Sequence, residues 1–142
     1  NVMAAENAGY YGPLAERNPE ALSVNLRERL AQGAKVSAGD YVRSIAAREM
    51  LYGAVERALD GVSALITLPS CGPAPKGLGS TGNPVFNGMW TYLGVPCVTL
   101  PLLTIDGMPC GVQLIGKRRD EGRLLAIARW LEEQVAERGV LR

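Results

Sequence analysis

The sequence predicts an α/β fold in which a parallel or mixed sheet is flanked by helices in layers. Residues 1–60 carry mainly helical patterns, and residues 61–142 alternate short apolar runs with further helical patterns. Glycine and proline bound the apolar runs, and strands interleaved with helices are typical of layered α/β architectures. The 142 residues suit a single domain, which would bury roughly 70% of its extended-chain surface.

Two helices are expected before residue 34. Residues 3–11 form a weak helical pattern that Gly12-Pro13 should close, because proline disfavours a helical conformation in the residue before it. Residues 20–31 form a second helical pattern, which should end at Gly33.

A long third helix should follow Ser37 and Asp40, which have roughly the spacing of a capping box. In that motif the two side chains satisfy free N–H groups at the start of a helix. The helix has an apolar stripe with a period close to 3.6 residues, formed by Tyr41, Ile45, Tyr52, Val55 and Leu59. Arg48 falls within this stripe, and we expect it to form a structural ion pair.

The next segment predicts a strand, a loop and a helix. Residues 64–68 form an apolar run that suits a strand covered on both faces, and the proline- and glycine-rich residues 69–80 should be a loop. Asn83-Pro84 favours a helix start, since asparagine caps free N–H groups and proline has none to lose. We expect that helix to end at Gly94.

The last third predicts a hairpin and a final helix. Residues 97–100 and 111–115 suit strands, joined through Asp106-Gly107, a dipeptide that tolerates the positive φ of a hairpin turn. Asp120 can cap a helix over residues 121–138. The apolar face of this helix consists of Leu124, Ala128, Leu131 and Val135.

Composition excludes several classes of function. A net charge of +1 favours neither a nucleic-acid nor a membrane partner. Three cysteines without C-x-x-C spacing, and no histidine, predict neither disulfides nor a metal site. No run approaches the ~20 apolar residues of a membrane span, and no secretory signal is recognisable. We therefore expect a cytoplasmic protein without a cofactor.

The chain begins at Asn1 rather than at an initiator methionine. We therefore expect an internal piece of a longer polypeptide, although processing would explain the same beginning.

Motifs for chemistry are weak. Gly77-Leu-Gly-Ser-Thr-Gly82 matches the dinucleotide-binding pattern, but prolines separate it from the preceding strand, so an irregular loop is favoured. The absence of histidine excludes a Ser-His-Asp or Cys-His arrangement within this chain. Ser70 and Ser80 are most simply turn residues. The basic run Lys117-Arg118-Arg119 suits a solvated surface, with an anion clamp as the alternative.

Aromatic residues concentrate near the expected helix after Pro84. Phe86 and Trp90 lie four residues apart and share a helix face, which is compatible with core packing. A pocket wall is the alternative, because large rings beside Gly88 would border an apolar slot while Asn87 and Thr91 supply polar contacts. The pattern leaves both interpretations open.

The order of features from Ala64 to Gln134 resembles the C-terminal part of the amidase signature family. The most specific runs are Thr81-Gly-Asn-Pro-Val-Phe-Asn-Gly-Met-Trp90 and Gly107-Met-Pro-Cys-Gly-Val-Gln-Leu-Ile-Gly116. Residues 20–60 match the family more loosely. The resemblance implies that residues 1–142 are the C-terminal segment of a single layered α/β/α amidase domain, whose mixed sheet is flanked by helices. Residues 61–142 would contribute its pocket-lining loop.

The resemblance implies hydrolysis of a carboxylic amide or urea-like C–N bond through a serine acyl-enzyme, without a metal. The family's two serines and lysine belong to a Gly/Ser-rich segment and its upstream region, which these 142 residues do not contain. No residue here therefore receives a catalytic role, and this segment alone should be inactive. By position in the family, the substrate pocket would be lined by Thr81, Pro84, Asn87, Gly88, Cys71 and Trp90. Asn83 stands where relatives commonly carry an acidic residue.

The implied partners are a small-molecule amide and the remainder of the amidase chain, and a homo-oligomer is left open. One alternative is a non-catalytic binding or assembly module derived from the same fold. The other is the glutaminase subunit of a tRNA-dependent amidotransferase. The second is disfavoured, since those subunits usually carry a Tyr-Leu-x-Asp-type stretch where this chain has Val85-Phe-Asn-Gly-Met-Trp90.

Overall fold

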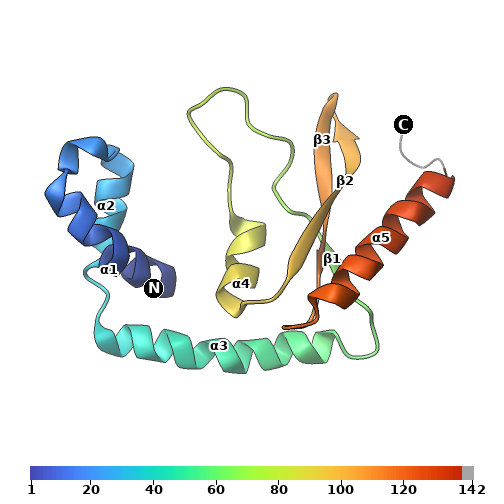
Figure 1. The fold of residues 1–142 in the computed structure, drawn as a ribbon, viewed down its shortest axis with the longest axis horizontal. Coiled ribbons are helices and arrows are strands. Elements are labelled where there is room, and N and C mark those ends of the chain that lie inside the picture. The colour runs from blue at the N-terminus through green and yellow to red at the C-terminus, as the bar shows by residue number, and fades with distance from the viewer. Residues whose placement is uncertain (139–142) are drawn as a thin grey trace. The chain divides into compact units, whose positions relative to one another are not determined.

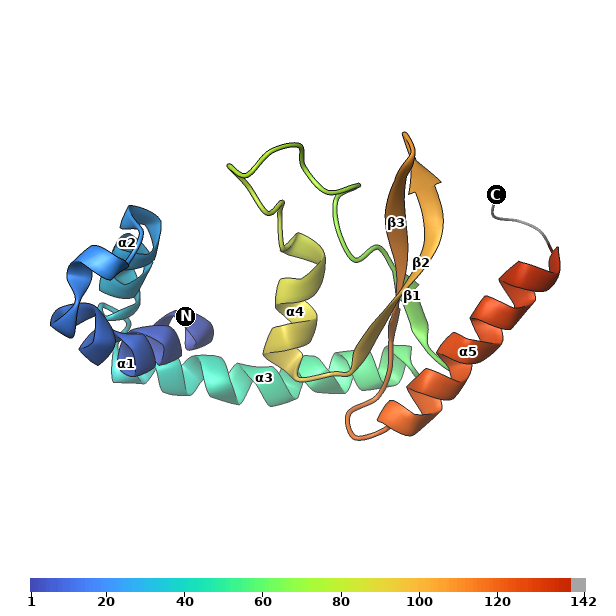
Figure 2. The ribbon, with the colours of Figure 1, turned by 45° about the horizontal axis from the view of Figure 1, so that its top comes forward.

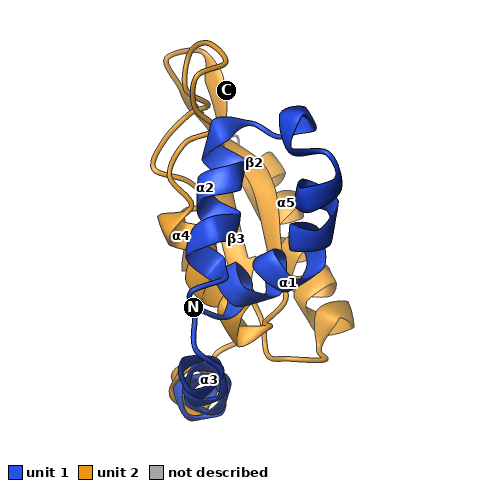
Figure 3. Ribbon diagram, turned by 90° about the vertical axis from the view of Figure 1, so that its left-hand side faces the viewer, with its two compact units in different colours: residues 1–52 blue, residues 53–142 orange. Residues whose placement is uncertain are grey.

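A computed structural model of the chain describes residues 1–138, which fall into two compact units, one of residues 1–52 and one from residue 53 onward (Figure 3). The first contains α1 (Val2–Arg17), the short 3-10 helix η1 (Pro19–Ala21), α2 (Val24–Gly33) and most of α3 (Ala38–Ala58). α1 and α2 pack closely, because a Cβ at Gly33 would collide with the backbone of Ala4.

The first two helices differ from their predictions. α1 continues through Gly12-Pro13, so the expected break there is wrong. Proline removes a single helical hydrogen bond, and Gly12 lacks the Cβ that would clash with the proline ring. α2 begins at Val24 rather than near residue 20, because η1 precedes it and Ser23 Oγ accepts the N–H of Leu26 at 3.3 Å as a cap.

The start of α3 confirms the predicted cap. Ser37 Oγ accepts the Asp40 N–H at 3.0 Å and donates its hydroxyl to Asp40 Oδ2 at 2.6 Å. That hydroxyl, followed by Arg43 at 2.7 Å, holds the pKa of Asp40 below its ordinary value of 3.8. The members of the predicted apolar stripe within α3 are half-buried, as is Arg48, whose ion pair stays a prediction.

The second unit contains a three-stranded sheet in the order β1-β3-β2, formed by β1 (Leu65–Thr67), β2 (Cys97–Ile105) and β3 (Met108–Ile115). The pairs in the described part of the chain are antiparallel, so within these residues the sheet is not the parallel or mixed one that was expected. The α/β class is confirmed, but residues 64–68 are not covered on both faces. Ile66 is 67% exposed, because β1 is an edge strand and the last helix packs mainly on β2 and β3.

The hairpin between β2 and β3 confirms the predicted turn. Asp106 (φ 50°) and Gly107 (φ 75°) connect Ile105 directly to its pairing partner Met108. Both strands extend further than predicted. β2 continues past Pro101 because the ladder shifts register between Leu100 and Leu103, where proline's missing N–H is tolerated.

Helices lie on opposite sides of this sheet (Figures 1 and 2). α5 (Glu121–Arg138) has its predicted bounds, and its Leu124 and Ala128 pack on Leu100 and Leu114 as the hydrophobic core. α4 (Val85–Leu93) lies beside the other face. Across residues 1–138, no helix combines the length and apolar character needed to cross a bilayer.

Candidate functional site

The start of α4 is built as its sequence predicts, with a shift of one residue. Pro84 is the N-cap, and its carbonyl accepts the N–H groups of Asn87 at 2.9 Å and Gly88 at 3.0 Å. Asn83 Oδ1 accepts the Val85 N–H at 3.0 Å. The helix ends at Gly94, which adopts the left-handed conformation expected of a terminating glycine.

A chain of side-chain amides joins this helix to the sheet and to the preceding loop. Asn87 Nδ2 donates to the carbonyl oxygen of Pro69 at 2.8 Å, and Gln113 Nε2 donates to Asn87 Oδ1 at 2.9 Å. We call Pro69, Asn87 and Gln113 the amide relay. It runs from the buried C-terminal half of β3, the central strand of the sheet, to the exposed first turn of α4 and fixes the beginning of the loop between β1 and α4.

Gly111 makes room for the amide relay. A Cβ on this residue would collide with Cγ2 of Thr99 and lie 2.8 Å from Cγ of Pro69. Gly111 and Gln113 are two residues apart on one strand and therefore face the same side of the sheet. The missing side chain thus lets Pro69 lie against the sheet beside Gln113.

The structure brings together some of the predicted pocket residues. Pro84, Asn87 and Gly88 form the exposed first turn of α4, and Trp90 is half-buried one turn later. The other two predicted residues, Cys71 and Thr81, are exposed in the loop that precedes α4. The predicted loop at residues 69–80 is confirmed.

The two loop serines have the local roles expected of turn residues. Ser70 Oγ donates to the carbonyl of Gly72 at 2.6 Å, and Ser80 Oγ accepts the N–H of Gly82 at 3.1 Å. The glycine pattern at 77–82 lies in the irregular loop, as predicted.

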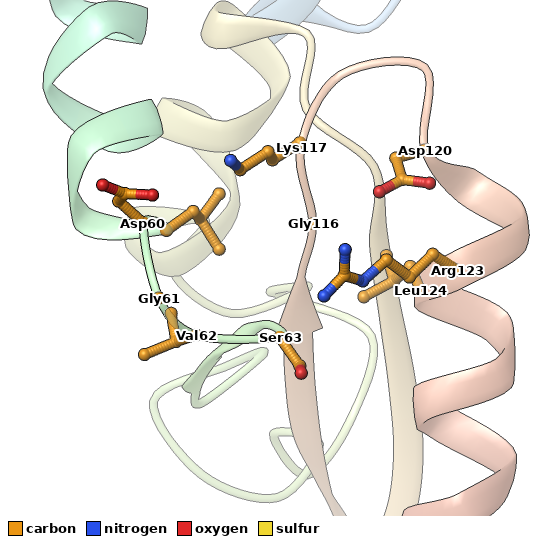
Figure 4. A pocket seen from close by; sticks show the side chains of 10 residues that line it. Asp60, Gly61, Val62, Ser63, Gly116, Lys117, Asp120, Arg123 and Leu124 are labelled. Carbon is orange, nitrogen blue, oxygen red and sulfur yellow. The ribbon is translucent and has the colours of Figure 1, made fainter.

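A separate polar cavity of about 340 Å³ lies at the start of α5 (Figure 4). Lys117 extends toward Asp60, while Asp120 and Arg123 line the side formed by the helix. Two carboxylates and two cations balance its charge, so the cavity favours neither anions nor cations. None of the predicted pocket residues lines it, and we place the candidate site at α4.

The sequence analysis did not identify two residues that contact α4, Gln113 and Arg118. Gln113 lies within the family-like run 107–116, but no partner and no role could be predicted for it from the sequence. Arg118 was assigned to a solvated basic run, but it is half-buried and its Nε donates to the carbonyl of Leu93 at 2.7 Å. It therefore caps the C-terminal end of α4, where free carbonyls favour a cation.

Comparison with known proteins relates the chain to one group of enzymes, although no family model matches it. It is 35% identical over 124 residues to a glutamyl-tRNA(Gln) amidotransferase subunit from Methylocella silvestris, covering 76% of this chain and 25% of that protein. It is 27% identical over 150 residues to 2-amino-5-chloromuconic acid deaminase of Comamonas testosteroni, covering 96% of this chain and 32% of that protein.

Solved structures show the same relationship. A crystal structure of an amidase matches 92% of this chain and 33% of its own, with a TM-score of 0.84 at 31% identity. A 6-aminohexanoate cyclic dimer hydrolase shares the fold, with a TM-score of 0.67 at 20% identity. The chain thus spans about a quarter to a third of the proteins it resembles.

Proposed function

Because this chain belongs to the amidase signature family, whose C-terminal part it matches, we propose that it is the C-terminal segment of an amidase. The parent enzyme hydrolyses a carboxylic amide or urea-like C–N bond. This segment completes the sheet and lines the substrate channel, and it lacks the catalytic serines and lysine. The observation that carries the proposal is the structural match to the amidase. It has a TM-score of 0.84 and includes 92% of this chain but only 33% of the amidase chain.

The proposed reaction divides labour between two parts of the parent protein. A serine outside residues 1–142 attacks the amide carbonyl, the amine leaves with a proton, and water then displaces the serine to release the acid. This chain has no histidine that could activate a nucleophile of its own. Ser70 and Ser80 are hydrogen-bonded within their own turns, which supports a structural role for both.

The proposed pocket wall is the first turn of α4 with the adjoining loop. Pro84, Asn87 and Gly88 expose both backbone and a carboxamide on one turn, and the half-buried Trp90 adds an apolar ring. Such a surface suits a small neutral amide, because apolar walls with a few placed polar groups orient uncharged ligands. Cys71 and Thr81 would border the same channel from the loop.

Kinetics of the natural full-length protein test the proposed wall. Asn87→Ala should raise KM for a primary carboxamide about tenfold, the equivalent of one well-placed hydrogen bond, with kcat changed much less. Met89→Ala is the matched control, because Met89 is an exposed residue of the same helix outside the proposed pocket. Equal effects of the two substitutions on KM would contradict the assignment of the wall.

A second candidate function is the glutaminase subunit of a tRNA-dependent amidotransferase. It is favoured by the 35% identity to a glutamyl-tRNA(Gln) amidotransferase subunit. Hydrolysis of free glutamine that depends on partner subunits and tRNA would select this candidate. Hydrolysis of other amides by the full-length protein alone would select the stand-alone amidase. If the full-length protein hydrolyses neither glutamine nor other amides, the non-catalytic module is the remaining candidate.

A further inference from the structure

We propose that Gln113 is a positioning residue for the substrate pocket, because through the amide relay it fixes the orientation of the Asn87 carboxamide. The inference rests on the proposed function, in which Asn87 lines the pocket. Gln113 itself does not touch substrate, since it is buried on β3, the central strand of the sheet, with only 4% of its surface exposed.

The order of hydrogen bonds determines which way each amide faces. The Pro69 carbonyl can only accept, so the Asn87 NH₂ group must face it. The Asn87 oxygen then faces Gln113, whose NH₂ group must donate to it. One backbone carbonyl thus defines both side-chain orientations, which otherwise could flip between oxygen and nitrogen.

This arrangement leaves Gln113 Oε1 buried without a hydrogen-bond partner within residues 1–138. An unsatisfied buried acceptor is unfavourable, and a methionine would fill nearly the same space without it. Packing therefore does not explain the glutamine. What the glutamine provides is the N–H group that holds Asn87 Oδ1.

A fixed Asn87 has a defined chemistry toward a ligand. Its carboxamide has two N–H donors and two acceptor positions, and the relay uses one of each. The remaining donor and acceptor belong to an exposed residue, so a neutral carboxamide, which also carries one acceptor and one donor group, can reach them. Without Gln113, the Asn87 carboxamide would keep only its contact to the Pro69 carbonyl, so it would be held less firmly and would present these groups in the right place less often.

The first test uses Gln113→Met in the natural full-length protein. We expect KM for a carboxamide to rise about tenfold, with kcat within about twofold and a melting temperature unchanged or higher. A purely structural role for Gln113 predicts the opposite, a lower melting temperature without a change in KM. An unchanged KM would overturn the proposal.

The second test uses Gln113→Glu, which makes the contact pH-dependent. Above the pKa of the new carboxyl group, its oxygen faces Asn87 Oδ1 without a proton, and KM should be raised. Burial raises the pKa of a carboxyl group, and below that pKa the protonated oxygen can donate and restore KM toward the wild-type value. A ratio of variant to wild-type KM that does not vary with pH would contradict the relay.

Thr99→Val is the matched control for both tests, since Thr99 is the pairing partner of Gln113 on β2 and lies outside the relay. It should leave KM and its pH dependence as in the wild type.

Nuclear magnetic resonance of ¹⁵N-labelled asparagine side chains separates failure of this inference from failure of the proposed function. The Asn87 NH₂ group should exchange slowly in the wild type and faster in Gln113→Met. If the protein hydrolyses no amide, the proposed function fails while this measurement still decides whether Gln113 fixes Asn87. Equal exchange in both proteins would overturn the positioning role.

Discussion

At the scale of single residues, the candidate site depends on Gly111, which has no side chain, as well as on the residues of the amide relay. Gly111 allows Pro69 to lie against the sheet, and Pro69 in turn orients Asn87 and Gln113. A Cβ at residue 111 would meet both Thr99 on the neighbouring strand and the ring of Pro69, so both residues would have to move to make room for it.

Gly111→Ala should therefore lower the free energy of unfolding by about 1–3 kcal/mol, the usual cost of overpacking. Chemical denaturation of the natural protein would measure the change. Gly122→Ala in α5 is the control, because a Cβ there meets nothing within 4 Å and alanine favours a helix. Equal stability of the Gly111→Ala variant and the wild type would contradict the close contact.

Asp40 provides a prediction about pH. Ser37 first, and then Arg43, lower its pKa, so the folded state favours the ionised carboxylate. The resulting stabilisation is complete above the ordinary value of 3.8 and is lost as pH falls through the lower folded pKa. The difference in unfolding midpoint between wild type and Asp40→Asn should therefore shrink as pH falls below about 4. A constant difference down to about pH 2 would show that the carboxylate is not favoured by folding.

At the scale of elements, local signals predicted those elements that local interactions determine. The turn at Asp106-Gly107, the end of α4 at Gly94 and the bounds of α5 follow from backbone preferences and one-sided apolar spacing. The predicted end of α1 at Gly12-Pro13 was wrong, because a helix that continues through a proline loses only one backbone hydrogen bond. The cover over β1 was mispredicted because burial of an edge strand depends on neighbours distant in sequence.

The position of α4 gives an element-scale prediction. Arg118→Lys keeps the charge but loses the Nε–H that reaches the Leu93 carbonyl, so the last turn of α4 should open more often. Hydrogen exchange of the α4 backbone should become faster in this variant. Arg119→Lys, a neighbouring exposed site, is the control, and equal exchange in the two variants would contradict the capping role.

At the scale of the whole molecule, the family could be predicted from the order of motifs, and the comparisons confirm it. The six proposed pocket residues followed from that resemblance and remain a proposal. The amide relay could not be predicted, because it joins residues 18 and 26 positions apart in the chain, and only the fold brings them together. Gln113 belongs to a run that is specific for the family, but the sequence alone does not show which residues it contacts.

The division of labour within the parent enzyme is the central claim, and locating its nucleophile tests it most directly. The natural full-length protein would be treated with a serine-directed fluorophosphonate, and the modified peptide identified by mass spectrometry. We predict one adduct, on a serine outside residues 1–142, accompanied by loss of amide hydrolysis. An adduct on Ser70 or Ser80 that abolishes hydrolysis would contradict the account.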